Sequence, residues 1–157
     1  MGRIYKAAFQ SLAVGTSGVL EFFTLYSGAT KIIRVHSIEL GQDTQTGVDN
    51  LLYSIHRLPA TVTPGTGGTS LVFNPVNPND TAATITGKYG NTGATTTGGT
   101  AQLVQAGALN IINGYLDLPP DAHRLLCDLS QAWVMKLDSL PTESTTFSGS
   151  ITVEEVN

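Results

Sequence analysis

Apolar and polar residues alternate along both ends of this chain with the period of two that half-buried β-strands show. In the first part, the pattern predicts strands over residues 4–13, 19–25, 31–40 and 51–58. In the last part, it predicts strands over residues 109–118, 124–126, 132–137 and 145–156. Short strands at this regular spacing are typical of an all-β, single-domain antiparallel β-sandwich, and we expect one of the jelly-roll type.

The middle of the chain breaks this pattern and carries almost no charge. Between Leu58 and Leu116 the only charged residues are Asp80 and Lys88, and most of the others are Thr, Gly, Asn and Pro. Loops of this composition suit contact with another protein or another copy of the chain, because the centres of interfaces are depleted of charged residues. The sequence therefore predicts a rigid β scaffold that presents long neutral loops.

Long loops are expected wherever Pro and Gly gather, because proline lacks a backbone donor and glycine loses much entropy in regular structure. These loops lie at about 59–69, 74–82 and 89–100, with a short strand over 83–88. The Thr- and Gly-rich stretch 90–99 has no apolar face, so it is either disordered or held by its neighbours. Short helices remain an alternative over 101–109 and 120–131.

Length and composition are those of one domain over residues 1–157, with 41% apolar residues to form a core. Charged residues make up only 13% and the net charge is −4. Because phosphate binding needs clustered Lys and Arg, the scattered basic residues indicate no nucleic-acid partner.

No stretch approaches the roughly 20 apolar residues of a membrane span, so we expect no membrane partner. The single cysteine, Cys127, excludes an intrachain disulfide, and its apolar neighbours predict a buried, inert thiol.

Metal binding finds little support in the sequence. His36 and His56 could supply two ligands if they lay on adjacent strands, but two imidazoles make a poor site. His123 stands apart from both. Of the paired-histidine pattern of metal-binding cupins, only His36 and Glu39 are present, with Arg34 at the partner position. We therefore expect no metal site and no cofactor.

Signatures of catalysis are also missing from the sequence. Residues 15–18 lack the Gly-x-Ser-x-Gly spacing of a nucleophile elbow, and residues 87–89 lack the Ser or Thr of a phosphate-binding loop. Glu154 and Glu155 are adjacent on a predicted strand, so their side chains face opposite ways, and we expect a solvated end of the strand. The sequence predicts no catalytic residue and a protein that is not an enzyme.

A set of sequence blocks spans most of the chain and carries a further signal. The blocks are residues 110–119, 133–137 and 149–155, the loop 74–80, and the opening segments 5–9, 22–23 and 31–40. In their spacing and apolar pattern they resemble small β-rich proteins encoded among phage structural genes.

This resemblance implies a jelly-roll virion protein, namely a capsid decoration or cement protein bound to the phage head. Such a protein is made in the host cytoplasm and acts on the capsid surface of the virion. Its implied partners are itself, as a homotrimer, and the major capsid protein or another virion protein.

A carbohydrate- or receptor-binding module of a tail or head fibre is the alternative function. It would need exposed aromatic side chains that stack on sugar rings, and the candidates are Tyr89, Tyr115 and Trp133. Trp133 and Tyr115 both lie inside predicted strands, so we expect them in the core.

Overall fold

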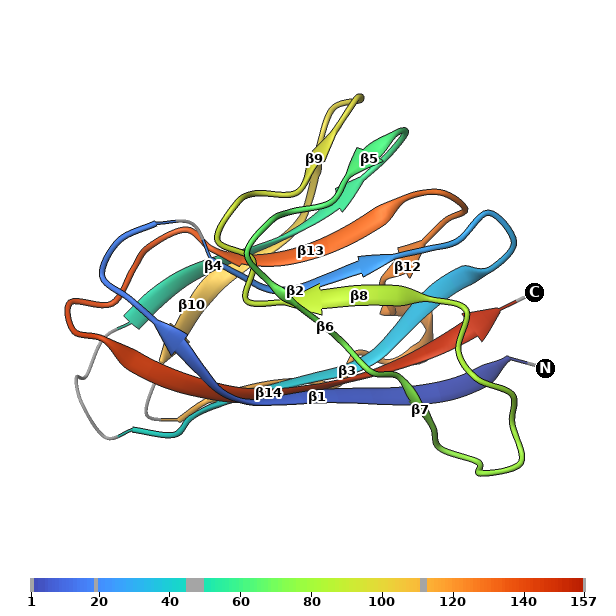
Figure 1. The fold of residues 1–157 in the computed structure, drawn as a ribbon, viewed down its shortest axis with the longest axis horizontal. Helices are drawn as coiled ribbons and strands as arrows, with labels where there is room; N and C mark the ends of the chain where they lie inside the picture. Colours follow the sequence, from blue (N-terminus) through green and yellow to red (C-terminus); the bar gives the residue numbers. More distant parts are fainter. Residues whose placement is uncertain (1, 19, 45–49, 111–112, 157) are drawn as a thin grey trace.

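The computed structural model describes residues 2–18, 20–44, 50–110 and 113–156. Its regular elements over these residues are β-strands and one short 3-10 turn, η1 (Asp121–His123). Two antiparallel sheets pack face to face as a sandwich, so the prediction of an all-β sandwich is confirmed (Figure 1). Over the same residues, no helix has the length and apolar content needed to cross a membrane.

Each large sheet holds six strands. The first contains, in spatial order, β11 (Tyr115–Asp117), β3 (Ile32–Gln42), β14 (Thr145–Val156), β1 (Arg3–Val14) and β7 (Asn74–Pro75), with β12 (Leu126–Cys127) also paired to β3. The second contains β10 (Gln102–Asn110), β4 (Asn50–Leu58), β13 (Ala132–Leu137), β2 (Glu21–Tyr26), β8 (Thr86–Tyr89) and β6 (Thr69–Ser70). A separate pair, β5 (Val62–Thr63) and β9 (Thr96–Thr97), extends from the sandwich in Figure 1.

The chain crosses repeatedly between the two sheets. Four strands lie side by side in each sheet and alternate along the chain. In the first sheet they are β11, β3, β14 and β1, and in the second they are β10, β4, β13 and β2. Along the sequence, every step between these strands changes sheet, except the step from β4 to β10, which are neighbours. Strand β14 therefore lies in the middle of its sheet, between β1 and β3.

The core lies between the sheets and follows from the alternation in the sequence. In β1, for example, Tyr5, Ala7 and Phe9 are buried while the residues between them are exposed. Aromatic rings join the layers, because Phe22 packs edge to face on Phe147 with ring centres 5.2 Å apart. Such rings contribute most of the buried apolar area of a small core.

The alternative of short helices over 101–109 and 120–131 was wrong, and so was one predicted strand. Residues 102–110 form the strand β10, which pairs with β4, and residues 120–131 hold only η1 and β12. The strand predicted over 109–118 is interrupted, because β10 ends at Asn110 and β11 begins only at Tyr115. Between them Gly114 has φ +71°, a left-handed turn conformation that glycine adopts without strain. Residues 111–112 of that predicted strand lie outside the described part of the chain.

The predicted loops are mostly irregular but contain short paired segments. The loop at 59–69 includes β5, that at 74–82 includes β7, and that at 89–100 includes β9. Both β7 and β6 lie at sheet edges, where a short segment with proline is tolerated. The strand predicted over 83–88 is shorter and lies later in the chain, because β8 covers Thr86–Tyr89 and residues 83–85 are irregular.

Candidate interaction surface

One side of the sandwich exposes a row of aliphatic side chains. Here β10 forms the edge of the second sheet, and β11 and β12 lie at the edge of the first. The two edges meet, because Gln105 on β10 donates a hydrogen bond to Tyr115 on β11 over 3.3 Å. We call this side the β10 margin and define it by its exposed aliphatic residues: Leu103, Val104, Leu116, Leu118 and Leu126.

Strand β10 lacks the features that normally keep an edge strand from pairing. It is nine residues long and contains no charged residue and no proline. Natural edges are usually short, charged, interrupted by proline or covered. The opposite edges of this protein follow that rule, because β6 and β7 are each two residues long and β7 includes Pro75. The β10 margin is therefore the side of the sandwich best suited to pair with another chain.

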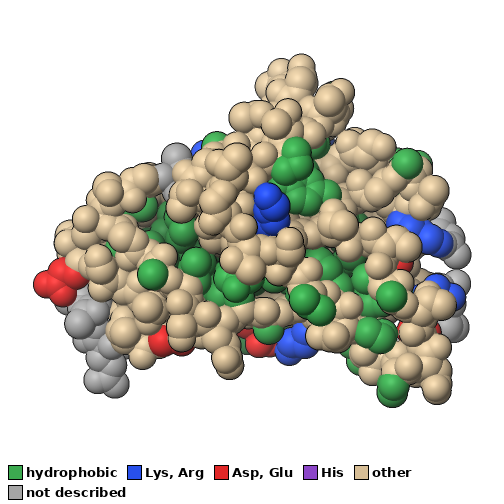
Figure 2. All heavy atoms as spheres, viewed as in Figure 1, with side chains coloured by type: hydrophobic (Ala, Val, Ile, Leu, Met, Phe, Trp, Pro, Cys, Tyr) green, Lys and Arg blue, Asp and Glu red, His purple; other side chains and the backbone are tan. Residues whose placement is uncertain are grey.

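A second exposed feature is the projection that β5 and β9 build. We define the Thr/Gly projection as residues 59–68 and 92–100, neither of which contains a charged residue. Figure 2 shows that its outer end carries neither basic nor acidic side chains. The predicted neutral loops thus come together from two distant parts of the sequence and stand out from the body of the sandwich.

The buried carboxylate of Glu21 holds the base of this projection. Its Oε1 accepts a hydrogen bond from the Thr95 backbone N–H at 2.6 Å, and its Oε2 accepts one from the Thr95 hydroxyl at 2.7 Å. Oε2 also accepts bonds from Asn91 Nδ2 at 2.7 Å and from the Thr24 hydroxyl at 2.8 Å. Glu21 is only 2% exposed, and these donors replace the water that its charge loses. Of the two alternatives for 90–99, the structure therefore shows a stretch held by its neighbours.

The two loops of the projection also pack closely against each other. Thr66 and Gly93 form an antiparallel bridge, and Gly93 donates its backbone N–H to the Thr66 carbonyl over 3.1 Å. A Cβ on Gly65 would lie 2.5 Å from the carbonyl oxygen of Gly93, which is too close for any side chain. The glycines in this stretch therefore serve close backbone packing as well as turns.

A second buried carboxylate corrects the prediction for the end of the last strand. Glu155 is 5% exposed, and its Oε1 accepts bonds from the backbone N–H groups of Thr84 at 2.6 Å and Ile85 at 2.8 Å. It fixes the segment that leads into β8, so it is not solvated. Glu154 faces the other way, as predicted, and contacts His36 at 2.9 Å and Arg34 at 3.2 Å. The two carboxylates therefore form no catalytic pair.

The histidines do not come together. His36 lies on β3 in the first sheet and His56 on β4 in the second, so the adjacent strands that a shared metal would need are not present. His123 lies in η1 and is exposed. Burial lowers the pKa of His56, with the nearby charge of Lys136 adding to the effect, so its imidazole is mainly neutral at pH 7. Across the described residues, no three His, Cys, Asp or Glu side chains gather as metal ligands.

The thiol of Cys127 and the ring of Trp133 are buried as predicted. Cys127 is fully buried, and burial raises the pKa of its thiol against the opposing hydrogen bond to Ser27. Trp133 is 1% exposed. Tyr89 is partly buried and stacks on Phe9 with ring centres 4.9 Å apart.

Tyr115 is also partly buried and packs edge to face on Tyr53. None of the aromatic rings in the described residues is exposed, so they offer no platform for stacking on a sugar.

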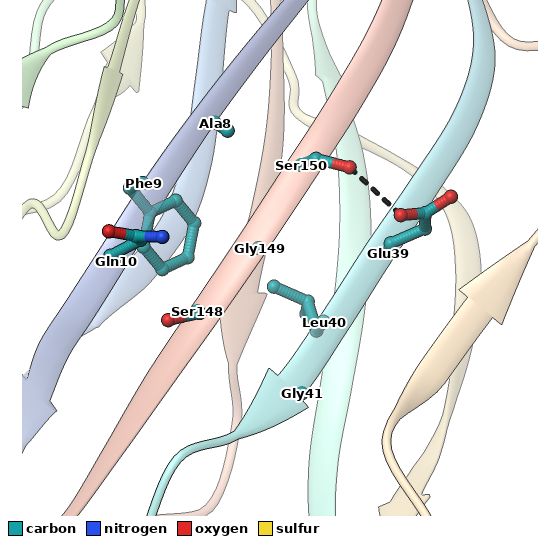
Figure 3. Close-up of a pocket in the computed structure, with 9 residues that line it drawn as sticks. All are labelled: Ala8, Phe9, Gln10, Glu39, Leu40, Gly41, Ser148, Gly149 and Ser150. Atoms are coloured by element: carbon teal, nitrogen blue, oxygen red, sulfur yellow. Dashed lines mark hydrogen bonds between the residues drawn. The ribbon is translucent and has the colours of Figure 1, made fainter.

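The outer face of the first sheet carries a shallow depression (Figure 3). Small residues on three strands form it, among them Ala8, Gly41 and Ser148. Its one carboxylate, Glu39, accepts a hydrogen bond from the Ser150 hydroxyl at 3.0 Å. The residues that line the depression include no histidine and no cysteine. Small side chains of this kind suit close contact with a flat surface.

No protein-family model, curated protein or solved structure matches this chain. Function must therefore be inferred from the fold and the surface. The fold and the surface both favour contact with other proteins, because the exposed features are the unprotected edge strand β10 and the uncharged Thr/Gly projection.

Proposed function

We propose that this chain is a non-enzymatic structural protein of a bacteriophage virion, which decorates or cements the capsid exterior as a homotrimer. Its partners would be other copies of itself and the major capsid protein or another virion protein. The observation that carries the proposal is the β10 margin, a long uncharged sheet edge with a row of exposed aliphatic side chains.

The order of the strands supports a jelly-roll fold within the sandwich class. A jelly roll has two sets of four neighbouring strands, with most connections crossing between the sheets, and the strand order here fits that pattern. Viral capsid domains use this fold, and so do lectins and cupins. The fold alone does not choose among them, but the separated histidines disfavour a cupin-like metal site and the buried aromatic rings disfavour a lectin.

Energetics favour self-association through the β10 margin. Leu103 and Leu116 are each 61% exposed, and Leu118 is 65% exposed. Burying one such side chain completely contributes about 1.5–3 kcal/mol. A neighbouring chain could also add a strand along the outer edge of β10. Because β10 itself is uncharged, pairing along this strand removes none of its own side-chain charges from water.

The Thr/Gly projection supports a second contact, with the capsid shell. It is uncharged yet held firmly by Glu21, so little entropy is lost when it docks. Three copies in one oligomer would present three projections at once, and multivalency would then strengthen a weak individual contact.

Light scattering over a range of concentrations should give a native mass near that of three chains. Replacing both Leu103 and Leu116 with lysine should reduce the mass to that of one chain, because the margin would then bring like charges together. At concentrations where the unmodified protein is also monomeric, the free energy of unfolding should change by no more than about 0.5 kcal/mol, since both side chains are exposed.

Val76→Lys provides a matched control for this experiment. Val76 is also 61% exposed, but it lies next to β7 at the opposite edge. This variant should keep the mass of the unmodified protein. A chain that stays monomeric at every concentration would contradict the proposed trimer. Failure of an oligomer to cosediment with empty capsid shells would contradict the decoration role alone.

A further inference from the structure

A pocket of about 260 Å³ opens at the β10 margin between the two sheets. Its lining residues are Arg57, Val104, Arg124, Leu125, Leu126 and Trp133. Arg57 and Trp133 are direct cross-strand neighbours on β4 and β13. The three residues from 124 to 126 come from the segment beside β3, where Val35 donates its backbone N–H to the Leu125 carbonyl over 2.9 Å. Both sheets thus contribute to the pocket.

The polar side chains of this pocket are all hydrogen-bond donors. Arg57 uses Nε and Nη2 to bind Gln102 Oε1, at 2.9 and 2.6 Å, which leaves three of its five N–H groups. Arg124 contacts Asp121 through Nη2 at 2.5 Å, and that carboxylate is 84% exposed at the rim. None of the lining side chains is an acceptor. The pocket therefore combines two guanidinium groups with no lining carboxylate.

Two donors in this pocket are buried without a partner. Within the described residues, Arg124 Nε and Trp133 Nε1 have no hydrogen-bond acceptor. The side chain of Trp133 is 1% exposed, so water does not reach its N–H freely. Buried donors of this kind are rare in folded proteins and call for an explanation, commonly a bound group. Neither nitrogen is accessible from the pocket as it stands, so an acceptor would reach them only after a side-chain movement.

We propose that this pocket binds a carboxylate carried on a short aliphatic stem. A planar carboxylate can accept hydrogen bonds from guanidinium and indole N–H groups side by side. Val104, Leu125 and Leu126 form the apolar walls that the stem would contact. A phosphate dianion is disfavoured, because it would lose more hydration in a pocket with apolar walls, where one of the two arginines is already paired with Asp121.

The carboxylate has two possible sources, a free small acid or an acidic side chain of an extended peptide. The site itself rests on the pocket geometry and does not depend on the virion role. Two probes separate the sources. Isovalerate represents the free acid, and a blocked tripeptide with glutamate between two valines represents the peptide. Tighter binding of one probe identifies the source.

Trp133 is the only tryptophan, so its indole N–H gives a single resonance in the ¹⁵N-labelled protein. Titration with isovalerate or the tripeptide should shift this resonance in a saturable way. Isovaleramide, the neutral analogue, should not shift it, and phosphate should bind more weakly than either acid. Arg124→Gln should weaken binding about tenfold or more, which is the effect of losing a charged hydrogen bond.

Arg3→Gln is the matched control, because Arg3 is a partly exposed cation that contacts Asp80 at the far edge of the first sheet. It should leave the titration unchanged. An indole resonance that no carboxylate shifts would overturn the proposal. So would equal shifts with isovaleramide, or an affinity that Arg124→Gln does not change in a variant with the unmodified unfolding midpoint. Tighter binding of phosphate would overturn the assignment of the ligand class.

Discussion

Replacing Glu21 with alanine should lower the free energy of unfolding by about 3–5 kcal/mol. The change removes the acceptor for the Thr95 backbone N–H and for the side chains of Thr95, Asn91 and Thr24. Each donor left buried without an acceptor costs about 1–3 kcal/mol, and partial rearrangement reduces the sum. Urea unfolding followed by circular dichroism measures the loss.

The same substitution should open the Thr/Gly projection. Without Glu21, the segment around Thr95 loses its anchor, so limited proteolysis should cut between residues 91 and 100 in the variant before the unmodified protein is cut. Glu154→Ala is the control, because this carboxylate is partly exposed and contacts Arg34 and His36. It should cost about 1 kcal/mol or less and leave the projection resistant. Equal losses in the two variants would contradict the anchoring role of Glu21.

Trp133→Ala should destabilise the protein by about 3–5 kcal/mol, because it leaves a large cavity between the sheets. Trp133 is 1% exposed and is among the largest fully buried side chains. Trp133→Phe should cost clearly less, since it keeps an aromatic ring and removes an N–H that has no acceptor in the described structure. Thermal unfolding of both variants tests this order. An unchanged midpoint for Trp133→Ala would show that the ring does not support the core.

Most of the long strands were predictable because they bury one face, whereas β13 is buried on both faces and showed as a continuous apolar run. The predicted bounds 132–137 and 145–156 agree with β13 and β14, and 51–58 differs from β4 by one residue. Strand β10 was missed for a physical reason. As an edge strand it exposes consecutive residues, Leu103 and Val104, and its register shifts between Leu103 and Gln105, so no alternation appears in its sequence. By contrast, the break at Asn113-Gly114 carried a turn signal that the prediction overlooked.

The functional features were less predictable than the fold. Glu21 stands in an apolar strand, but its partners Asn91 and Thr95 lie about 70 residues away, and nothing local identifies them. The inward position of Arg57 had a readable signal. Because Leu51, Tyr53 and Ile55 alternate toward the core, the next inward position on β4 is residue 57. A cation at an inward position of a strand is unusual, and the prediction overlooked this signal.

The central place of β14 in its sheet governs how this chain can fold. Strand β1 pairs with β14 from Arg3 opposite Glu155 to Val14 opposite Thr145, so β1 cannot form this pairing until β14 is available. During synthesis, the first sheet cannot close until residues 145–156 have left the ribosome. Such distant pairing gives the fold a high contact order, for which refolding takes milliseconds to seconds. Until that step, the apolar faces of β1 and β3 are exposed, and the unfinished chain depends on chaperones or dilution to avoid aggregation.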